Sequence, residues 1–224
     1  MTDKPTVVFD LDGTLADTIP DLVAALNRTL AGLHIPPVKA ADVAHLTGKG
    51  GLRAMISQSL HRAAHPTEAN ELETLFQATA QNYGSHVAVD SKLYPGVIPS
   101  LNTFQQEGWQ LAICTNKPVR QAIDLMRAFG IEQMFATIAG VDSFDVKKPD
   151  PRHLTQTIKR AGGQPHRSVM VGDTINDIQT AKAANIPVIA VDFGYSDVPV
   201  GDLAPDRVIS TFDDLFAHAK ALIR

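Results

Sequence analysis

The chain has 224 residues, of which 44% are hydrophobic and 20% are charged, and its 20 Lys and Arg against 24 Asp and Glu give a formal net charge of -4. This composition is that of a globular protein and excludes intrinsic disorder, collagen and coiled coil. Because the charge is mildly acidic and no basic block stands out, we expect neither nucleic acid nor a membrane surface as a partner.

Cysteine use and the N-terminal residues bear on the compartment. Cys114 is the single cysteine, so no internal disulfide can form and a reducing compartment is expected. No run approaches the roughly 20 apolar residues of a membrane span, and residues 1–5 lead into a strand-like segment without a signal-peptide pattern. We therefore expect a cytoplasmic protein, either a monomer or a homodimer.

The first predicted strand, Thr6–Phe9, is followed by a long segment with helical periodicity and no buried strand. Three apolar stripes recur there at helical spacing: Leu22, Val23, Leu26, Leu30 and Leu33; Leu52, Met55, Ile56 and Leu60; Leu72, Leu75, Phe76 and Tyr83. We interpret residues 16–92 as a small α-helical domain inserted after the first strand, with hinges at 16–20 and 91–96.

From about residue 94 onward, short apolar strands alternate with helices. The predicted strands are Leu111–Cys114, Thr137–Ala139, Ser168–Val171, Pro187–Val191 and Arg207–Ile209, and the predicted helices are Arg120–Phe129, Pro151–Ala161 and Ile175–Ala184. Gly130, Gly162 and Asn185 follow these helices as left-handed stops. Residues 1–15 and 93–224 are thus predicted to form an α/β fold, a Rossmann-like parallel sheet in a three-layer α/β/α core.

Polar residues follow the predicted strands where the sheet should end. Asp10 and Asp12 follow the first strand, Thr115 and Asn116 the second, Asp173 and Asp177 the fourth, and Lys148 ends the loop after the third. The carboxyl ends of parallel strands share one edge, which is where open α/β sheets bind ligands. A cluster of carboxylates would repel itself without a cation, and hard oxygen ligands suit Mg²⁺.

Each of these residues also has a common structural explanation. Asp12 before Gly13 is typical of a turn, Thr115 of a helix cap, and a loop lysine such as Lys148 is usually solvated. Asp173 and Asp177 are also typical of an acidic helix start. Their occurrence in order, each beyond a strand, favours attack of a carboxylate on phosphorus beside a metal and a phosphate pocket.

These segments resemble the four motifs of the haloacid dehalogenase superfamily of phosphotransferases. The resemblance rests on Val8–Leu15, Thr115-Asn116-Lys117, Lys148-Pro149, and Gly172-Asp173 with Asp177, and the helical insertion resembles that superfamily's small cap domain. Closer similarity is to the phosphoglycolate phosphatases, through segments such as Tyr94–Val97 and Phe193–Ser196. Asn185 departs from the glycine usual there, and Asn tolerates the left-handed conformation.

The resemblance implies a role for each matched residue. Asp10 would be the nucleophile, Asp12 the general acid and base, and Thr115, Asn116 and Lys148 would bind the phosphoryl group. Mg²⁺ would be held by Asp10, the Asp12 carbonyl and Asp173, with Asp177 supporting its waters. In the cap, Lys49 or Arg53 of the stretch Thr47–Arg53 would meet a substrate carboxylate.

The sequence therefore predicts a Mg²⁺-dependent phosphomonoester hydrolase of a small phosphorylated metabolite, with 2-phosphoglycolate as the expected substrate. Open alternatives are a phosphatase of another small metabolite, a phosphonoacetaldehyde hydrolase using Lys49 as a Schiff base, and a sugar-phosphate mutase. A receiver-like phosphorylation switch is the non-enzymatic alternative. The eight histidines lack metal-ligand spacing and are predicted to be superficial or incidental.

Overall fold

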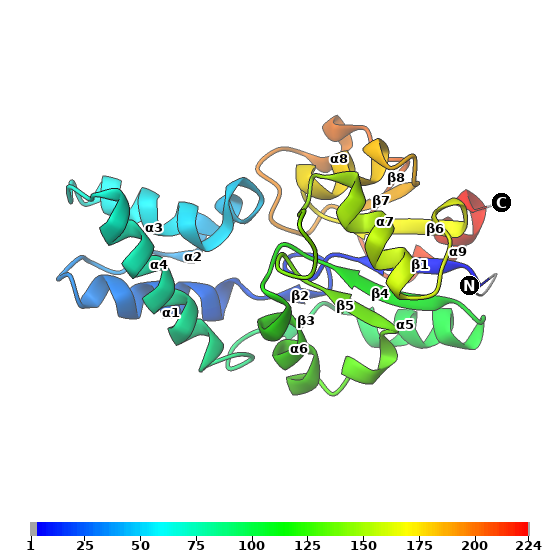
Figure 1. Cartoon of the computed structure of the whole chain (residues 1–224), viewed down its shortest axis with the longest axis horizontal. Helices are drawn as coiled ribbons and strands as arrows, with labels where there is room; N and C mark the ends of the chain where they lie inside the picture. Colours follow the sequence, from blue (N-terminus) through cyan, green and yellow to red (C-terminus); the bar gives the residue numbers. More distant parts are fainter. Residues whose placement is uncertain (1–3, 224) are drawn as a thin grey trace. The chain divides into compact units, whose positions relative to one another are not determined.

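Figure 1 shows the computed structural model of the chain, which describes residues 4–223. The chain folds into two compact units. The larger unit comprises the chain up to Asp17 together with Leu93 onward, and the smaller unit is Thr18–Lys92. Across the described residues, no helix has both the length and the apolar run needed to cross a membrane.

The larger unit is built on a six-stranded parallel sheet in the order β5-β4-β1-β6-β7-β8. These strands are β1 (Thr6–Phe9), β4 (Gln110–Cys114), β5 (Thr137–Ala139), β6 (Ser168–Gly172), β7 (Val188–Val191) and β8 (Arg207–Ile209). The helices of this unit are α5 (Val97–Gln106), α6 (Val119–Ala128), α7 (Pro151–Arg160), α8 (Ile175–Ala183) and α9 (Leu215–Leu222), with 3-10 turns η2 (Glu132–Met134), η3 (Pro165–Arg167) and η4 (Val200–Leu203). The predicted Rossmann-like α/β fold is confirmed.

Strand β1 lies at the centre of the sheet and fixes where the strand ends meet. Phe9 at its end pairs with Ile113 of β4 on one side and with Val171 of β6 on the other. The three central strands therefore end at nearly the same level, and the residues that follow them lie at one edge of the sheet.

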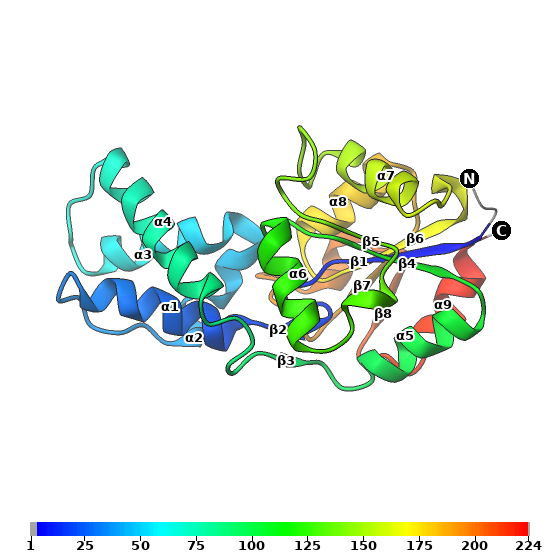
Figure 2. The same ribbon diagram turned by 60° about the horizontal axis from the view of Figure 1, so that its bottom comes forward.

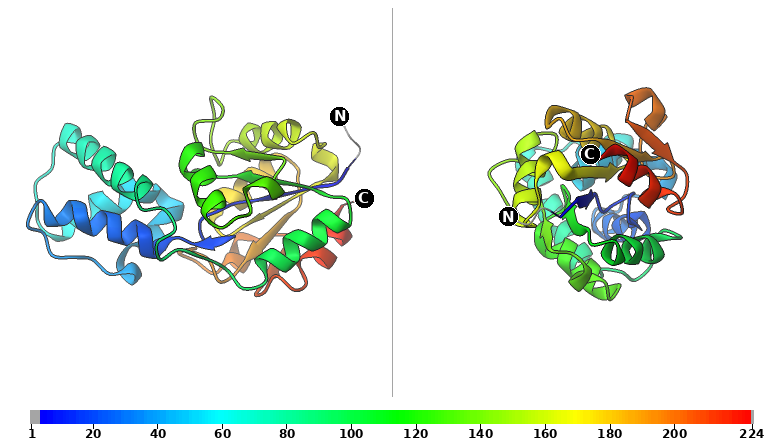
Figure 3. Two further views of the ribbon diagram at one scale, coloured as in Figure 1. Left: turned by 90° about the horizontal axis from the view of Figure 1, so that it is seen from below. Right: turned by 90° about the vertical axis from the view of Figure 1, so that its right-hand side faces the viewer.

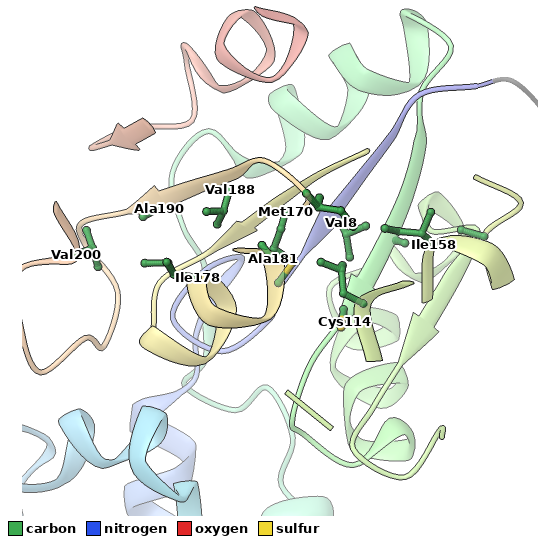
Figure 4. Close-up of a cluster of buried hydrophobic side chains, with 13 residues drawn as sticks. Val8, Cys114, Ile158, Met170, Ile178, Ala181, Val188, Ala190 and Val200 are labelled. Carbon is green, nitrogen blue, oxygen red and sulfur yellow. The ribbon is translucent and has the colours of Figure 1, made fainter. Parts of the chain in front are cut away.

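Helices cover both faces of this sheet, as apolar runs of buried parallel strands require. Helices α7 and α8 lie over one face and α5 and α9 over the other (Figure 2). The core beneath α7 and α8 joins Val8, Met170 and Val188 of the strands to Ile158 and Ile178 of the helices (Figure 4). On the opposite face α5 and α9 run side by side (Figure 3), and Phe104 packs edge-on against Phe9, Trp109 and Phe216.

The predicted helix stops have the expected backbone. Gly130, Gly162 and Asn185 have positive φ of 72°, 84° and 54°, the left-handed conformation that ends a helix. Asn185 adopts it although it has a Cβ, so the departure from glycine leaves the helix end unchanged. The three preceding helices end within one residue of the predicted boundaries.

The smaller unit is helical, as its apolar stripes predicted. Its elements are α1 (Ile19–Ala31), α2 (Ala40–Val43), the 3-10 helix η1 (Ala44–Lys49), α3 (Gly51–Arg62) and α4 (Ala69–Gly84). Helix α4 packs against α1 and α3, and the buried side chains Leu26, Met55 and Tyr83 come from these three helices. Two short strands, β2 (Ala16–Asp17) and β3 (Lys92–Leu93), pair where the chain passes from one unit to the other.

One histidine corrects the sequence interpretation. His153 on α7 is fully buried, whereas all eight histidines were predicted to be superficial or incidental. Its Nε2 lies 3.0 Å from the Gly140 carbonyl oxygen and its Nδ1 lies 3.6 Å from Sγ of Cys114. The pattern missed it because a buried, hydrogen-bonded histidine has the same local spacing as an exposed one.

Candidate active site

Three buried carboxylates meet at the carboxyl edge of the sheet. Asp10 follows β1, Asp173 follows β6, and Asp177 lies in the first turn of α8. One oxygen from each lies within 4.8 Å of the others. The strand-end argument predicted this convergence.

The backbone around Asp173 and Asp177 is shaped to hold their side chains. Asp173 accepts hydrogen bonds from the Thr14 hydroxyl at 2.8 Å and from the Tyr195 backbone N–H at 2.8 Å. Asp177 accepts from the backbone N–H and hydroxyl of Thr174, at 3.0 and 2.8 Å, in a capping box. Gly172 makes room for Asp177, since a Cβ there would overlap its carboxylate.

Lys148 is buried between two of these carboxylates. Its Nζ lies 2.9 Å from Oδ1 of Asp10 and 2.6 Å from Oδ1 of Asp177, and its side chain is 2% exposed. A lysine in a loop is usually solvated, but Lys148 is buried. Asn116 fixes the loop, because its side-chain amide donates to the Lys148 carbonyl and accepts from the Lys148 backbone N–H.

Thr115 and Lys117 complete this end of β4. Thr115 is buried, and its hydroxyl accepts a hydrogen bond from the Lys117 backbone N–H at 3.2 Å. The Lys117 ammonium lies 2.8 Å from Oδ1 of Asp12. Sequence reasoning gave Lys117 no role of its own, although its place two residues beyond Thr115 at a strand end was a usable signal.

The electrostatics of the carboxylate cluster favour a bound cation. Burial, helped by the negative charge of Asp177, raises the pKa of Asp10 to about 6 against the opposing charge of Lys148. Burial, followed by repulsion from Asp177 and Asp10, raises the pKa of Asp173 well above its usual value. The same two residues, Asp10 and Asp177, raise the pKa of Lys148 even though burial opposes this. One ammonium thus leaves the three carboxylates short of positive charge, and their hard oxygens suit a small divalent metal ion.

The two residues predicted to recognise a substrate carboxylate belong to the smaller unit. Arg53 on α3 forms an exposed ion pair with Glu73 at 2.6 Å and lies over the Phe76 ring at 4.3 Å. Lys49 ends η1, and Gly50 and Gly51 follow it with positive φ of 132° and 59°. These glycines start α3, so the stretch is also a turn before a helix.

Comparison with known proteins identifies the family. The model of the haloacid dehalogenase-like hydrolases matches residues 7–191. The chain belongs to this family. The hydrolase is 46% identical to the phosphoglycolate phosphatase of Mesorhizobium japonicum, over 99% of this chain and 97% of that protein. It is 44% identical to the phosphoglycolate phosphatase of Agrobacterium fabrum, over 93% of this chain and 89% of that protein.

A solved structure agrees with these sequence relatives. The crystal structure of a predicted phosphoglycolate phosphatase from Haemophilus somnus 129pt superposes with a TM-score of 0.89 at 29% identity, covering 97% of this chain and 99% of that chain. The predicted resemblance is therefore confirmed, and the hydrolase is a phosphatase that acts on a small phosphorylated substrate.

Proposed function

We propose that this hydrolase is a Mg²⁺-dependent phosphoglycolate phosphatase that works through a phosphorylated Asp10. The observation that carries the mechanism is the buried Asp10 carboxylate, which lies 2.9 Å from the Lys148 ammonium and beside Asp173 and Asp177. The substrate is supported by the two phosphoglycolate phosphatases that are 46% and 44% identical to the chain.

In the proposed reaction, Asp10 and Asp12 divide the chemistry. An Asp10 oxygen attacks phosphorus, the ester P–O bond breaks, and its electron pair stays on the glycolate oxygen, which takes a proton from Asp12. Water then attacks the phosphorylated Asp10 and gives its proton to Asp12. The P–O bond to Asp10 breaks, which regenerates the carboxylate and releases phosphate.

The remaining site residues bind the phosphoryl group in this proposal. Thr115 and Asn116 donate hydrogen bonds to its oxygens, and Lys148 neutralises charge shared between Asp10 and the phosphoryl group. The reciprocal bonds between Asn116 and the Lys148 backbone support a joint role, because they hold both side chains at the same strand end.

The carboxylate cluster suits Mg²⁺. Asp10, the Asp12 backbone carbonyl and Asp173 would hold the ion, and Asp177 would orient its waters. When bound, the ion supplies the positive charge that allows two anions, the nucleophile and the phosphoryl group, to approach each other.

Phosphate release from a panel of phosphomonoesters tests this function. With Mg²⁺ present, 2-phosphoglycolate should be preferred over phosphosugars, nucleotides, pyrophosphate and phosphonoacetaldehyde by about tenfold or more in kcat/KM. Asp10→Asn keeps the shape of the side chain but removes the nucleophile, so it should abolish turnover. The matched control is Asp192→Asn, because Asp192 also follows a strand but is exposed and accepts a hydrogen bond from Ser210.

The panel also tests the proposed role of Lys49 and Arg53. Replacing either by Ala should raise KM for 2-phosphoglycolate and leave KM for ethyl phosphate, which has no carboxylate, nearly unchanged. Full activity of Asp10→Asn would contradict the role of Asp10 as the nucleophile. A preference for an ester without a carboxylate would contradict 2-phosphoglycolate as the substrate but would not contradict the role of Asp10.

A further inference from the structure

Lys117 places a buried positive charge against Asp12. Its side chain is 4% exposed, that of Asp12 is 19% exposed, and the ammonium lies 2.8 Å from Oδ1 of the carboxylate. Lysine side chains are almost never fully buried unless they are paired, because the ammonium loses its hydration. The fold therefore holds this ammonium specifically opposite Asp12.

The backbone of Lys117 is fixed on both sides. Its N–H donates to the Thr115 hydroxyl at 3.2 Å, and its carbonyl accepts from the Val141 backbone N–H at 3.0 Å. Gly140 allows this close approach, because a Cβ there would press on the Lys117 carbonyl oxygen. The side chain of Lys117 therefore begins from a fixed backbone just beyond β4. Strand β4 pairs directly with β1, the strand that leads to Asp12.

We propose that Lys117 is a positioning residue that orients the Asp12 carboxyl group for proton transfer. This proposal rests on the proposed function, in which Asp12 protonates the leaving oxygen and later accepts a proton from water. Oδ1 accepts a hydrogen bond from an ammonium, so the proton that Asp12 transfers is carried on Oδ2. With Oδ1 held by Lys117, rotation of the carboxyl group is restricted and Oδ2 keeps one orientation toward the ester oxygen.

The dependence on the leaving group separates this role from a purely structural one. An alkoxide such as that of glycolate needs a proton as the P–O bond breaks, whereas 4-nitrophenolate leaves readily without one. The ratio kcat/KM covers only the steps up to release of the leaving group. A variant that misorients Asp12 therefore loses more kcat/KM for the alkyl ester than for the aryl ester.

The test is Lys117→Met, measured with 2-phosphoglycolate and with 4-nitrophenyl phosphate at saturating Mg²⁺. We expect kcat/KM for 2-phosphoglycolate to fall by about tenfold or more beyond any loss with 4-nitrophenyl phosphate. Asp12→Asn should show the same selective loss. Lys182→Met is the matched control. Lys182 lies on α8, and its exposed ammonium donates to the Leu203 carbonyl at 3.1 Å.

Equal losses for the two esters, or no loss, would overturn the role of Lys117. If Lys117→Met does not fold, Lys117→Gln serves in its place, since its shorter polar side chain carries no positive charge. Asp10→Asn tests the proposed function separately, because it should abolish turnover of both esters whatever Lys117 does. If the wild type prefers another alkyl phosphomonoester, the ratio is taken with that ester.

Discussion

His153 is a neutral side chain in the core of the larger unit. A carbonyl oxygen only accepts hydrogen bonds, so the contact with Gly140 places the ring hydrogen on Nε2, and Nδ1 accepts from the Cys114 thiol. Burial, together with the positive charge of Lys148, lowers the pKa of His153 to about 4. Burial also raises the pKa of Cys114 to about 12, so the thiol keeps its hydrogen.

This histidine should make the protein sensitive to acid. In the unfolded chain its pKa is 6.5, so between pH 6.5 and about 4 the unfolded state binds the proton and the folded state does not. Its contribution to stability is complete above pH 6.5 and falls by about 3 kcal/mol on going to pH 4. Urea unfolding of the wild type and of His153→Gln across this range isolates the effect, because the carboxylates titrate in both proteins. If the difference in unfolding free energy between the wild type and His153→Gln stays constant from pH 7 to pH 4, His153 does not cause the acid sensitivity.

At the scale of residues, the sequence predicts which side chains converge at the site, but it does not predict the hydrogen bonds and ion pairs that position them. Asp10, Asp173, Asp177 and Lys148 converge because parallel strands end at a common edge, a rule that needs no side-chain detail. The burial of Lys148 depends on two hydrogen bonds with Asn116, which is 32 residues away in sequence. Such long-range pairs leave no local pattern. The place of Lys117 beyond a strand end is a local signal, but its pairing with Asp12, 105 residues away, is not.

At the scale of elements, Asp21 joins α1 to the segment that ends the smaller unit. Its carboxylate accepts hydrogen bonds from the backbone N–H groups of Val89, Asp90 and Ser91 at 2.9 to 3.0 Å, and from the Ser91 hydroxyl at 2.6 Å. Burial opposes ionisation, but the hydrogen bonds from Ser91, Asp90 and Val89 outweigh it and lower the pKa of Asp21. The start of one helix thus anchors the chain where it leaves the helical unit.

Asp21→Asn should weaken this anchor. The amide replaces one accepting oxygen by a donor that faces N–H groups, which costs about 2 kcal/mol of unfolding free energy. Limited proteolysis should then cut faster within residues 85–92, and thermal unfolding should begin at lower temperature. Asp90→Asn is the matched control, since the Asp90 side chain is exposed in the same segment and its replacement should change neither readout. Equal effects of the two substitutions would contradict the anchor.

Most elements could be predicted from their apolar periodicity. The six strands of the sheet lie within one residue of their predicted ranges because each is a short, mainly apolar run. The two-residue strands β2 and β3 could not be predicted, since each exists only through pairing with the other. Helices α5 and α9 are not among the predicted helices.

At the scale of the whole molecule, a net charge of -4 is unremarkable, but its distribution is not. Three buried carboxylates share one edge of the sheet, and within residues 4–223 the ammonium that pairs with this cluster is that of Lys148, which contacts Asp10 and Asp177. Their mutual repulsion raises the free energy of the folded state alone, because the unfolded chain separates the carboxylates in water. The stability of the larger unit should therefore be linked to occupancy of a cation site.

Magnesium should stabilise the folded protein through this site. An ion that binds only the folded state at about 100 times its dissociation constant adds about 2.7 kcal/mol to the unfolding free energy. We expect Mg²⁺ to raise the midpoint of thermal unfolding and EDTA to reverse the change. Asp173→Asn should lose this response, because it removes one of the three carboxylates and with it a proposed metal ligand and part of the repulsion. Asp192→Asn should keep the full response, since its carboxylate is exposed beyond β7 and outside the cluster. The same response in Asp173→Asn and the wild type would place the ion elsewhere and remove the link between the cluster and stability.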